Sequence, residues 1–386
     1  MKIAICAIGY NRVDSLSRLL FSLNAAVYDE NVTLIISLDR SKTLDVKTYS
    51  DEFEWKHGEK KVILQECNLG LRKHVLRCGQ YMNDYGFDAL VVLEDDITVS
   101  PYFYSYVKQC VIQYQNDDCI AGISLYSFPI NYITGYPFTP VDSEHDVYLM
   151  NCAMSWGQVW IKEKWNKFIN WYNRNDEEFS LPHLPASINQ WPKSSWLKYH
   201  TRYCIENDLY FVYPYVSLTT NNSDPGTHNK VGHTYMQSRL QCLPRKAWSL
   251  PPSSKIEVRY DGFFEPKFLY NHLNIDEEQL TINIYGTKTN SKNRYELSMN
   301  ALPYKIVKSF GLKYKPIEAN ILLDVDGNDI YLYDKSQGGL MCSVCPYYRV
   351  IEYFYFNVFN KLCVWHNLKY VIFNYFRYHY LNKFKK

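Results

Sequence analysis

The chain lacks several motifs that assign a sequence at once to a phosphate-binding class. The turn after the first expected strand reads Gly9-Tyr10-Asn11-Arg12 and fits neither GxGxxG nor GxxxxGK(S/T). Dinucleotide-binding dehydrogenases and P-loop NTPases hold phosphate with those glycine-rich turns, so both classes are disfavoured. The long Gly-rich, Arg-containing loop expected of a sugar nucleotidyltransferase is also missing.

Long hydrophobic runs, net charge and paired cysteines are scarce as well. No uninterrupted apolar stretch reaches about 18 residues, and residues 1–8 read as a first strand rather than a signal peptide. The formal net charge of +2 gives no indication of a nucleic-acid partner. The 11 cysteines are scattered, and the CxxC at 342–345 has no second pair with which to hold zinc. These features predict a cytoplasmic protein with reduced thiols.

What the sequence does contain is an alternation of strand and helix patterns. Apolar runs at 3–8, 32–37, 61–65, 89–93 and 119–125 predict strands, and helical spacing appears at 14–23, 68–85 and 101–115. Asp14 or Ser15 is the expected N-cap of the first helix. Such alternation predicts an α/β fold, with a mainly parallel sheet and helices on both faces. We expect this domain to span 1–250, followed by a mixed region at 251–340 and an aromatic, basic helical tail at 341–386.

Three consecutive carboxylates, Glu94-Asp95-Asp96, end the fourth expected strand. Adjacent anions repel one another, so a cation is needed to offset their charge. Mn²⁺ and Mg²⁺ favour oxygen ligands and usually bind through one or two carboxylates plus substrate phosphates. The triplet is therefore either a metal–diphosphate site or an acidic turn after a buried strand.

Two segments of the C-terminal third can each be interpreted in two ways. Residues 321–333 contain several Asp residues, but the spacing does not fit an EF-hand loop, and a β-hairpin with an Asp326-Gly327 turn is favoured. From residue 346 onward, aromatic residues alternate with Lys and Arg, and Glu352 is the only acid. Such a helix either lies on an anionic membrane surface or packs its aromatic stripe on the domain.

Several segments together resemble the GT-A nucleotide-diphosphosugar glycosyltransferases. They are AIGYNR at 7–12, SLD at 37–39, NLG at 68–70, FDALVVLEDDITVSPYF at 87–103, SWGQVW at 155–160 and GTH at 226–228. The resemblance covers about residues 2–235. Within this family, the sequence most resembles the N-acetylglucosaminyltransferases of N-glycan synthesis and bacterial family-2-like enzymes.

The resemblance implies a role for each matching residue. On the donor side, Tyr10, Asn11 and Arg12 line the nucleotide pocket, Asp39 binds the base, and Arg72 and Lys73 lie near the base or phosphates. Asp95 contacts the ribose or sugar, Glu94 the sugar hydroxyls, and Trp156 and Trp160 the floor of the sugar pocket. Asp96 binds Mn²⁺ or Mg²⁺, and His228 approaches the metal or diphosphate.

The chain departs from that family where the catalytic base is expected. The eukaryotic relatives carry an Asp pair just before a Trp, and this sequence reads Ser194-Ser195-Trp196. An inverting transfer needs a general base for the acceptor hydroxyl. His200 and Glu177 are the candidates for the catalytic base, with Asp176, Glu178 and Glu206 also near in sequence.

The sequence thus predicts metal-dependent transfer of a hexosyl or N-acetylhexosaminyl group. The donor is a nucleotide sugar, expected to be a UDP-sugar, and the acceptor a glycan or lipid-linked oligosaccharide of a bacterial surface polysaccharide. The tail suggests peripheral attachment to the inner face of the cell membrane. The competing hypothesis is a non-catalytic protein that binds nucleotide sugars or carbohydrate on the same scaffold.

Overall fold

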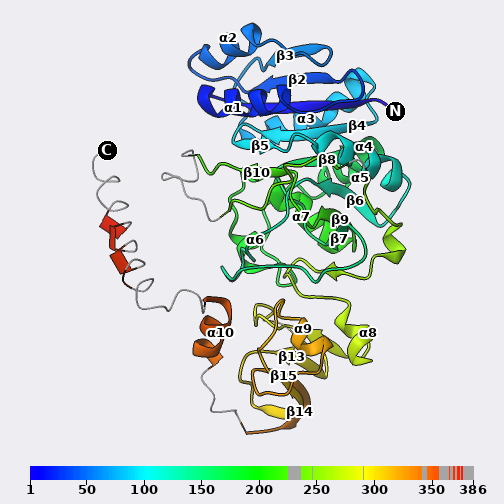
Figure 1. Ribbon diagram of the computed structural model, residues 1–386, viewed down its shortest axis with the longest axis vertical. Coiled ribbons are helices and arrows are strands. Elements are labelled where there is room, and N and C mark those ends of the chain that lie inside the picture. The colour runs from blue at the N-terminus through cyan, green and yellow to red at the C-terminus, as the bar shows by residue number, and fades with distance from the viewer. Residues whose placement is uncertain are drawn as a thin grey trace. The chain divides into compact units, whose positions relative to one another are not determined.

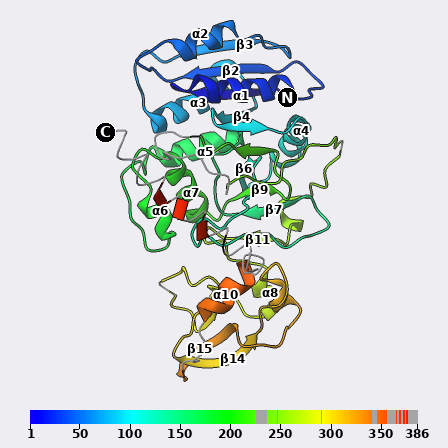
Figure 2. The ribbon, with the colours of Figure 1, turned by 60° about the vertical axis from the view of Figure 1, so that its left-hand side comes forward.

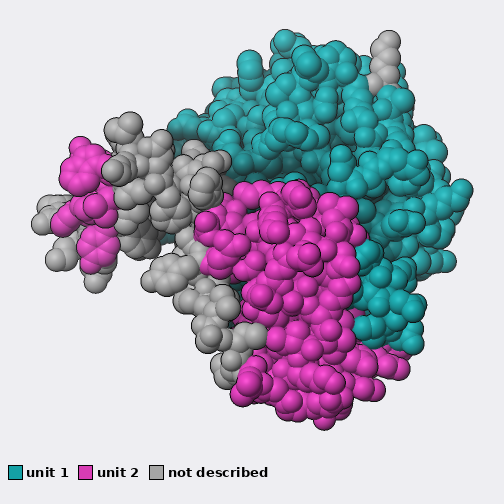
Figure 3. Space-filling view, turned by 60° about the horizontal axis from the view of Figure 1, so that its bottom comes forward, with its two compact units in different colours: residues 1–224, 233–276, 287–291 teal, residues 225–232, 277–286, 292–386 magenta. Residues whose placement is uncertain are grey.

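The computed structural model describes residues 1–224, 236–245, 247–289, 291–340 and 346–355, with residues 365, 368–369, 372–373 and 375–376 (Figure 1). These residues belong to two compact units, coloured separately in Figure 3. Unit 1 comprises Met1–Asp224, His233–Asp276 and Thr287–Ser291. Unit 2 comprises Pro225–Gly232, Glu277–Gly286 and Lys292–Lys386.

Unit 1 is built on one nine-stranded sheet with the order β11-β7-β9-β6-β8-β4-β1-β2-β3 (Figures 1 and 2). Five of its strand pairs are parallel, and the antiparallel pairs are β4–β8, β6–β8 and β7–β9. The strands are β1 (Ile3–Gly9), β2 (Thr33–Leu38), β3 (Lys60–Leu64), β4 (Ala89–Glu94), β6 (Ile120–Ser124), β7 (Val147–Met150), β8 (Gln158–Ile161), β9 (Tyr210–Pro214) and β11 (Arg259–Tyr260). The predicted α/β class with a mainly parallel sheet is confirmed.

Helices cover both faces of this sheet. Ile5 of β1 belongs to a core with Leu16 of α1 and Val107 of α4, whereas the next residue, Cys6, reaches Cys78 of α3. Alternate side chains of a strand point to opposite faces, so the two faces are buried under different helices. The helices of unit 1 are α1 (Val13–Asn24), α2 (Asp45–Glu52), α3 (Leu71–Tyr85), α4 (Phe103–Tyr114), α5 (Lys162–Tyr172), α6 (Ala186–Gln190), α7 (Leu197–Glu206), α8 (Leu269–Leu273) and the 3₁₀ turn Ser253–Lys255.

The prediction for the N-cap of α1 is wrong. The helix begins at Val13, with Arg12 in the N-cap position and no side-chain capping bond. Ser15 instead donates its hydroxyl to Asp224 at 2.8 Å, and Asp14 lies in the first turn, where a carboxylate favours the helix dipole. Arg12 therefore ends the β1–α1 turn, at the carboxyl end of β1.

A short two-stranded ribbon lies just beyond the acidic triplet. β5 (Ile97–Val99) pairs in antiparallel fashion with β10 (Thr219–Asn221), from Ile97 opposite Asn221 to Val99 opposite Thr219. This pairing brings a segment about 125 residues further along the chain next to Asp96.

Unit 2 contains a four-stranded mixed sheet in the order β12-β13-β15-β14. Its elements are β12 (Leu280–Ile282), β13 (Tyr295–Ser298), β14 (Tyr304–Phe310), α9 (Ala319–Leu322), β15 (Ile330–Gly338) and α10 (Pro346–Tyr355). The smaller mixed C-terminal region that the sequence predicts is thus confirmed. Within the described residues, none of the helices of either unit is both long and apolar enough to cross a bilayer.

The expected hairpin at 321–333 is wrong in its first strand. Ile321 belongs to helix α9, which Asp324 follows with a φ of 50°. β15 pairs instead with β14, which lies before α9 in the chain. The apolar run was too short for its periodicity to separate a buried helical turn from a strand.

Candidate active site

The acidic triplet lies where the sequence predicts, at the carboxyl end of β4. Ile8 of β1 is paired with Glu94 of β4 in parallel register, so the turns that follow the two strands leave the sheet side by side. β2 and β4 flank β1 on opposite sides, and the chain order therefore reverses at this point of the sheet. Open α/β sheets bind their ligands at such switch points, outside the carboxyl ends of the strands.

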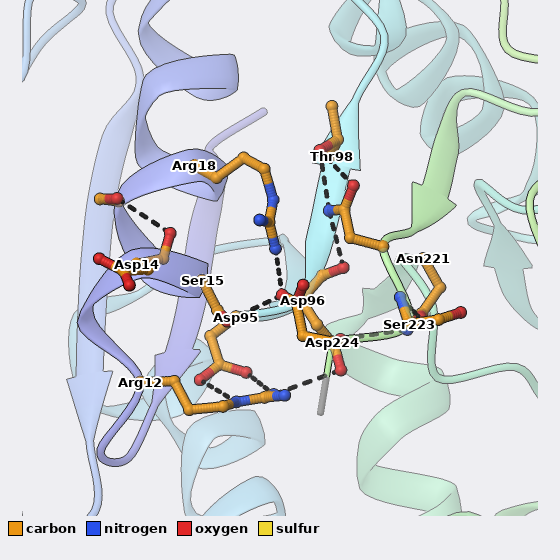
Figure 4. Close-up of polar contacts among 12 residues, drawn as sticks. Arg12, Asp14, Ser15, Arg18, Asp95, Asp96, Thr98, Asn221, Ser223 and Asp224 are labelled. Carbon is orange, nitrogen blue, oxygen red and sulfur yellow. Dashed lines mark hydrogen bonds and ion pairs between the residues drawn. The ribbon is translucent and has the colours of Figure 1, made fainter. Parts of the chain in front are cut away.

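Arg12, Asp95 and Asp96 form one connected group of charges (Figure 4). The guanidinium donates to both carboxylate oxygens of Asp95, from Nε at 3.2 Å and from Nη2. Its Nη2 also lies 3.2 Å from Oδ2 of Asp96. A guanidinium binds a carboxylate or a phosphate with the same two-pronged geometry.

The ribbon strand β10 supplies a second set of contacts. Asn221 donates its amide to Oδ1 of Asp96 at 3.1 Å, and the backbone N–H of Asn222 donates to the Asp96 carbonyl at 2.8 Å. Asp224 accepts from Ser15 and pairs with Arg18, both on α1 (Figure 4). Asp224, with its partners Ser15 and Arg18, was missed as a site residue because only the β5–β10 pairing brings it to α1.

Negative charge exceeds positive charge in this group. Burial raises the pKa of Glu94 to about 8, with help from the charges of Asp96 and Asp95. Burial likewise raises the pKa of Asp95 to about 6, although Arg12 opposes the rise. The pKa of Asp96 is also raised, mainly by burial, and Asp224 adds to the effect. Because Arg12 does not cancel these shifts, the site favours an additional cation.

The described residues fit one mode of divalent metal binding. Within the described part of the chain, no group of three or more His, Cys, Asp or Glu side chains is arranged to enclose a metal. Asp95 and Asp96 do present hard oxygen donors, and the neighbouring Asp224 interacts electrostatically with both. Mn²⁺ and Mg²⁺ are commonly held by one or two such carboxylates while a diphosphate completes the shell.

Asp39 lies 5% exposed after β2 and organises the neighbouring loop. Its Oδ1 accepts from the backbone of Arg40 at 2.9 Å and Leu69 at 2.8 Å, and its Oδ2 accepts from Gly70 at 2.9 Å. A carboxylate offers about four acceptor positions, so one remains for a ligand. Gly70, with a φ of 74°, is the N-cap residue of α3 and takes a conformation that favours glycine.

The other residues predicted to bind the nucleotide sugar lie in two places. Tyr10 and Asn11 are exposed on the β1–α1 turn beside Arg12, and Lys73 is exposed at the start of α3. Arg72 turns toward α7, where it donates to the Tyr199 hydroxyl at 2.7 Å and lies 4.8 Å from the centre of that ring. The structure thus brings Tyr10 and Asn11, but not Arg72, next to the charged group.

Trp196 connects α7 to the triplet. A hydrogen bond from its side chain acts against the rise in the pKa of Glu94, so the Ser194-Ser195 pair just before it lies near the site. Trp156 is half-buried, with its ring 5.0 Å from that of Tyr126. Trp160 is 1% exposed and stacks on Trp165 at 3.8 Å, which makes it a core residue rather than a pocket floor.

The predicted base candidates lie on α7 and on the loop after α5. His200 is 1% exposed and stacks on Phe168 at 4.2 Å, and burial lowers its pKa to about 3. Glu177 is exposed on the loop after α5, together with Asp176 and Glu178. Glu206 pairs with Arg202 and His183. His228, the predicted metal partner, lies outside the described residues.

Comparison with known proteins gives weak overlaps. No family model and no curated protein matches the sequence. Among solved structures, the chain is similar to S. aureus TarS 1–349 in complex with UDP, at 13% identity and a TM-score of 0.34, covering 55% of this chain and 60% of TarS 1–349. It is also similar to the mannosyltransferase PcManGT of Pyrobaculum calidifontis in complex with GDP-Man and Mn²⁺, at 9% identity and a TM-score of 0.35, covering 55% and 54%.

A third similar structure is mouse xyloside xylosyltransferase 1 in its apo form, at 10% identity and a TM-score of 0.35, covering 55% of this chain and 84% of that one. The chain spans about a third to three fifths of the lengths of the first solved structures it matches. Overlaps at these scores do not assign a family.

Proposed function

We propose that this protein is a glycosyltransferase that moves a hexosyl or N-acetylhexosaminyl group from a UDP-sugar to a glycan or lipid-linked acceptor. The observation that carries the proposal is the meeting of Arg12, Asp95 and Asp96 at the carboxyl ends of β1 and β4. The position at the sheet's switch point suits a nucleotide, and the excess of carboxylates suits a metal–diphosphate.

The donor would lie along the ends of β4, β1 and β2. Arg12 can exchange a carboxylate partner for a phosphate oxygen without changing the geometry of its hydrogen bonds. The remaining acceptor position of Asp39 suits an N–H of the base, which a uracil provides. Tyr10 and Asn11, exposed on the turn between Gly9 and Arg12, are placed to cover the nucleotide.

Asp96 is the proposed metal ligand, and Asp95 contacts the ribose or sugar. Mn²⁺ or Mg²⁺, when bound, supplies Lewis-acid stabilisation of the leaving diphosphate. Asn221 and Asn222 hold Asp96 by its side chain and its backbone carbonyl, and so orient the carboxylate before a ligand arrives. This preorganisation is what an electrostatic site needs, because the groups need not reorient as charge develops.

Glu94 lies beside Trp196, whose side chain hydrogen-bonds to it. Within the described residues, the hydrogen bonds that Arg12 makes to the triplet go to Asp95 and Asp96. We assign Glu94 to the hydroxyl groups of the transferred sugar or the acceptor. In an inverting transfer one group must take the acceptor proton. We assign this role to Glu94 in its ionised form, which a bound cation would favour by lowering its pKa.

The second candidate function is a non-catalytic protein that binds a nucleotide sugar. The observation that favours it is the presence of two serines where the related enzymes carry acids. Both functions use Arg12 and Asp39, but only catalysis requires turnover. The proposed acceptor, a bacterial surface polysaccharide precursor reached at the cytoplasmic face of the membrane, belongs to the catalytic hypothesis alone.

The test is release of UDP from a panel of UDP-sugars, with and without Mn²⁺ and with added glycan acceptors. We expect turnover that requires the metal and falls at least about 100-fold in Asp96→Ala, while Asp51→Ala, which removes an exposed helix ion pair on α2, leaves it unchanged. Metal-dependent binding of UDP without turnover on any acceptor would favour the non-catalytic protein. Pyrophosphate release from a sugar phosphate and a nucleoside triphosphate would instead identify a nucleotidyltransferase.

A further inference from the structure

The C-terminal tail carries an apolar helical face. Each of the described tail residues from 365 to 376 is helical and exposed. Five of them, Trp365, Leu368, Ile372, Phe373 and Phe376, are large and apolar, with exposed fractions from 47% to 64%. We call these five residues the tail face.

At helical spacing, the residues of the tail face fall on one side. At about 100° per residue, Leu368, Ile372, Phe376 and Phe373 fall within a sector of roughly 140° that includes Trp365. Lys369 lies in the same sector, with its ammonium 5.1 Å from the centre of the Trp365 ring. In the sequence, positions outside this sector include His366, Asn367, Asn374 and Arg377, together with Tyr370 and Val371.

The charge of this segment has a single sign. After Glu352 the sequence contains no Asp or Glu, whereas Lys361, Lys369, Arg377, Lys383, Lys385 and Lys386 are all basic. Each such cation is attracted to a surface rich in anionic lipid. An apolar face with aromatic residues, on a segment with only basic charges, is the combination that binds at the interface of an anionic bilayer.

We propose that the tail face inserts into the headgroup region of an anionic membrane and attaches the protein to that surface. A second copy of the chain is a poorer occupant, since pairing two tails would bring two sets of cations together. Lys369 suits the interface, because its apolar stem can lie along a membrane-inserted Trp365 while its ammonium stays in water. The proposal stands independently of the glycosyl-transfer activity.

The experiment is flotation of the full-length protein with vesicles of phosphatidylglycerol and phosphatidylcholine, or of phosphatidylcholine alone. We expect binding to the anionic vesicles at least about tenfold stronger than to the neutral ones. The triple variant Ile372→Ser/Phe373→Ser/Phe376→Ser should lose at least about tenfold of it. Leu323→Ser is the matched control, because Leu323 is also an exposed apolar side chain of unit 2, and it should bind as the wild type does.

Insertion is measured separately from attraction by quenching of tryptophan fluorescence with bromine-labelled lipid chains. The wild type should be quenched, and Trp365→Phe, which keeps the apolar face, should bind equally but lose much of the quenching. Unchanged binding of the triple variant, equal binding to both vesicles, or quenching that survives Trp365→Phe would overturn the proposal. If the wild type did not bind vesicles but formed dimers in sedimentation velocity, and the triple variant did not form dimers, the tail face would instead bind a second copy of the chain. UDP release measured without vesicles reports on the proposed function alone.

Discussion

The free energy of unfolding of unit 1 should fall at acidic pH because of the protonation of His200. The ring is 1% exposed among Phe168, Trp165 and Phe211, and burial lowers its pKa to about 3. An unfolded histidine has a pKa of about 6.5. Between these values the unfolded state binds a proton that the folded state does not, so stability must fall as the pH falls. The stabilisation is complete above the unfolded pKa and is lost progressively down to the folded one.

The size of this effect follows from the same two values. One pKa unit corresponds to about 1.4 kcal/mol, so lowering the pH from about 7.5 to about 5 should remove about 2 kcal/mol through this residue alone. The carboxylates with raised pKa values act in the opposite direction, and the matched variant His200→Gln removes only the histidine contribution. The free energy of unfolding should therefore decrease about 2 kcal/mol more in the wild type than in His200→Gln over this range.

The assay is urea unfolding followed by circular dichroism at both pH values, with UDP release measured at neutral pH. Equal pH dependence in the two proteins would refute the burial argument. A loss of turnover beyond about 100-fold in His200→Gln, with normal stability and normal KM, would restore His200 as the catalytic base that the sequence suggested.

Three further changes have defined outcomes. Arg12→Met leaves the buried Asp95 without its cation, so we expect a loss of about 3 kcal/mol in unfolding free energy. Arg12→Lys should recover part of this loss. If urea denaturation showed Arg12→Met to be more stable than Arg12→Lys, it would contradict the contact between Arg12 and Asp95. Asp224→Asn removes the partner of Arg18 and lowers the negative charge beside Asp96, and should weaken Mn²⁺-dependent UDP binding about tenfold in calorimetry, whereas no change would mean that Asp224 does not belong to the site. Gly79→Ala would place a Cβ 2.1 Å from the Trp165 ring, so thermal unfolding should show a loss of about 1–3 kcal/mol in stability. If the variant were as stable as the wild type, α3 and α5 would have to move apart to make room for the Cβ.

The sheet and its main helices could be predicted because their signals are local. The apolar runs at 3–8, 32–37 and 89–93 give β1, β2 and β4, and Gly86 ends α3 in a left-handed conformation, as a C-terminal glycine commonly does. The position of the acidic triplet follows from the strand before it. Its proximity to Arg12 follows once β1 and β4 are neighbours.

The rest of the site depends on contacts between distant segments. Asp224 reaches α1 only through the pairing of β5 with β10, which no local pattern announces. Periodicity also could not separate a core tryptophan from a pocket tryptophan, and Trp160 stacks on Trp165 whereas Trp156 stays half-buried. His200 suggested a base because of its residue type, and the aromatic rings that surround it come from α5, from β9 and from the residue before α7.

The central claim is that Asp96 and a divalent cation together hold the diphosphate of a nucleotide. The most direct measurement is calorimetric titration of UDP into the wild type, Asp96→Asn and the surface control Asp51→Asn, each with and without Mn²⁺. We expect Mn²⁺ to strengthen UDP binding at least about 100-fold in the wild type and in Asp51→Asn, and we expect Asp96→Asn to lose this gain. UDP binding that ignores Mn²⁺, or that Asp96→Asn leaves unchanged, would contradict the claim.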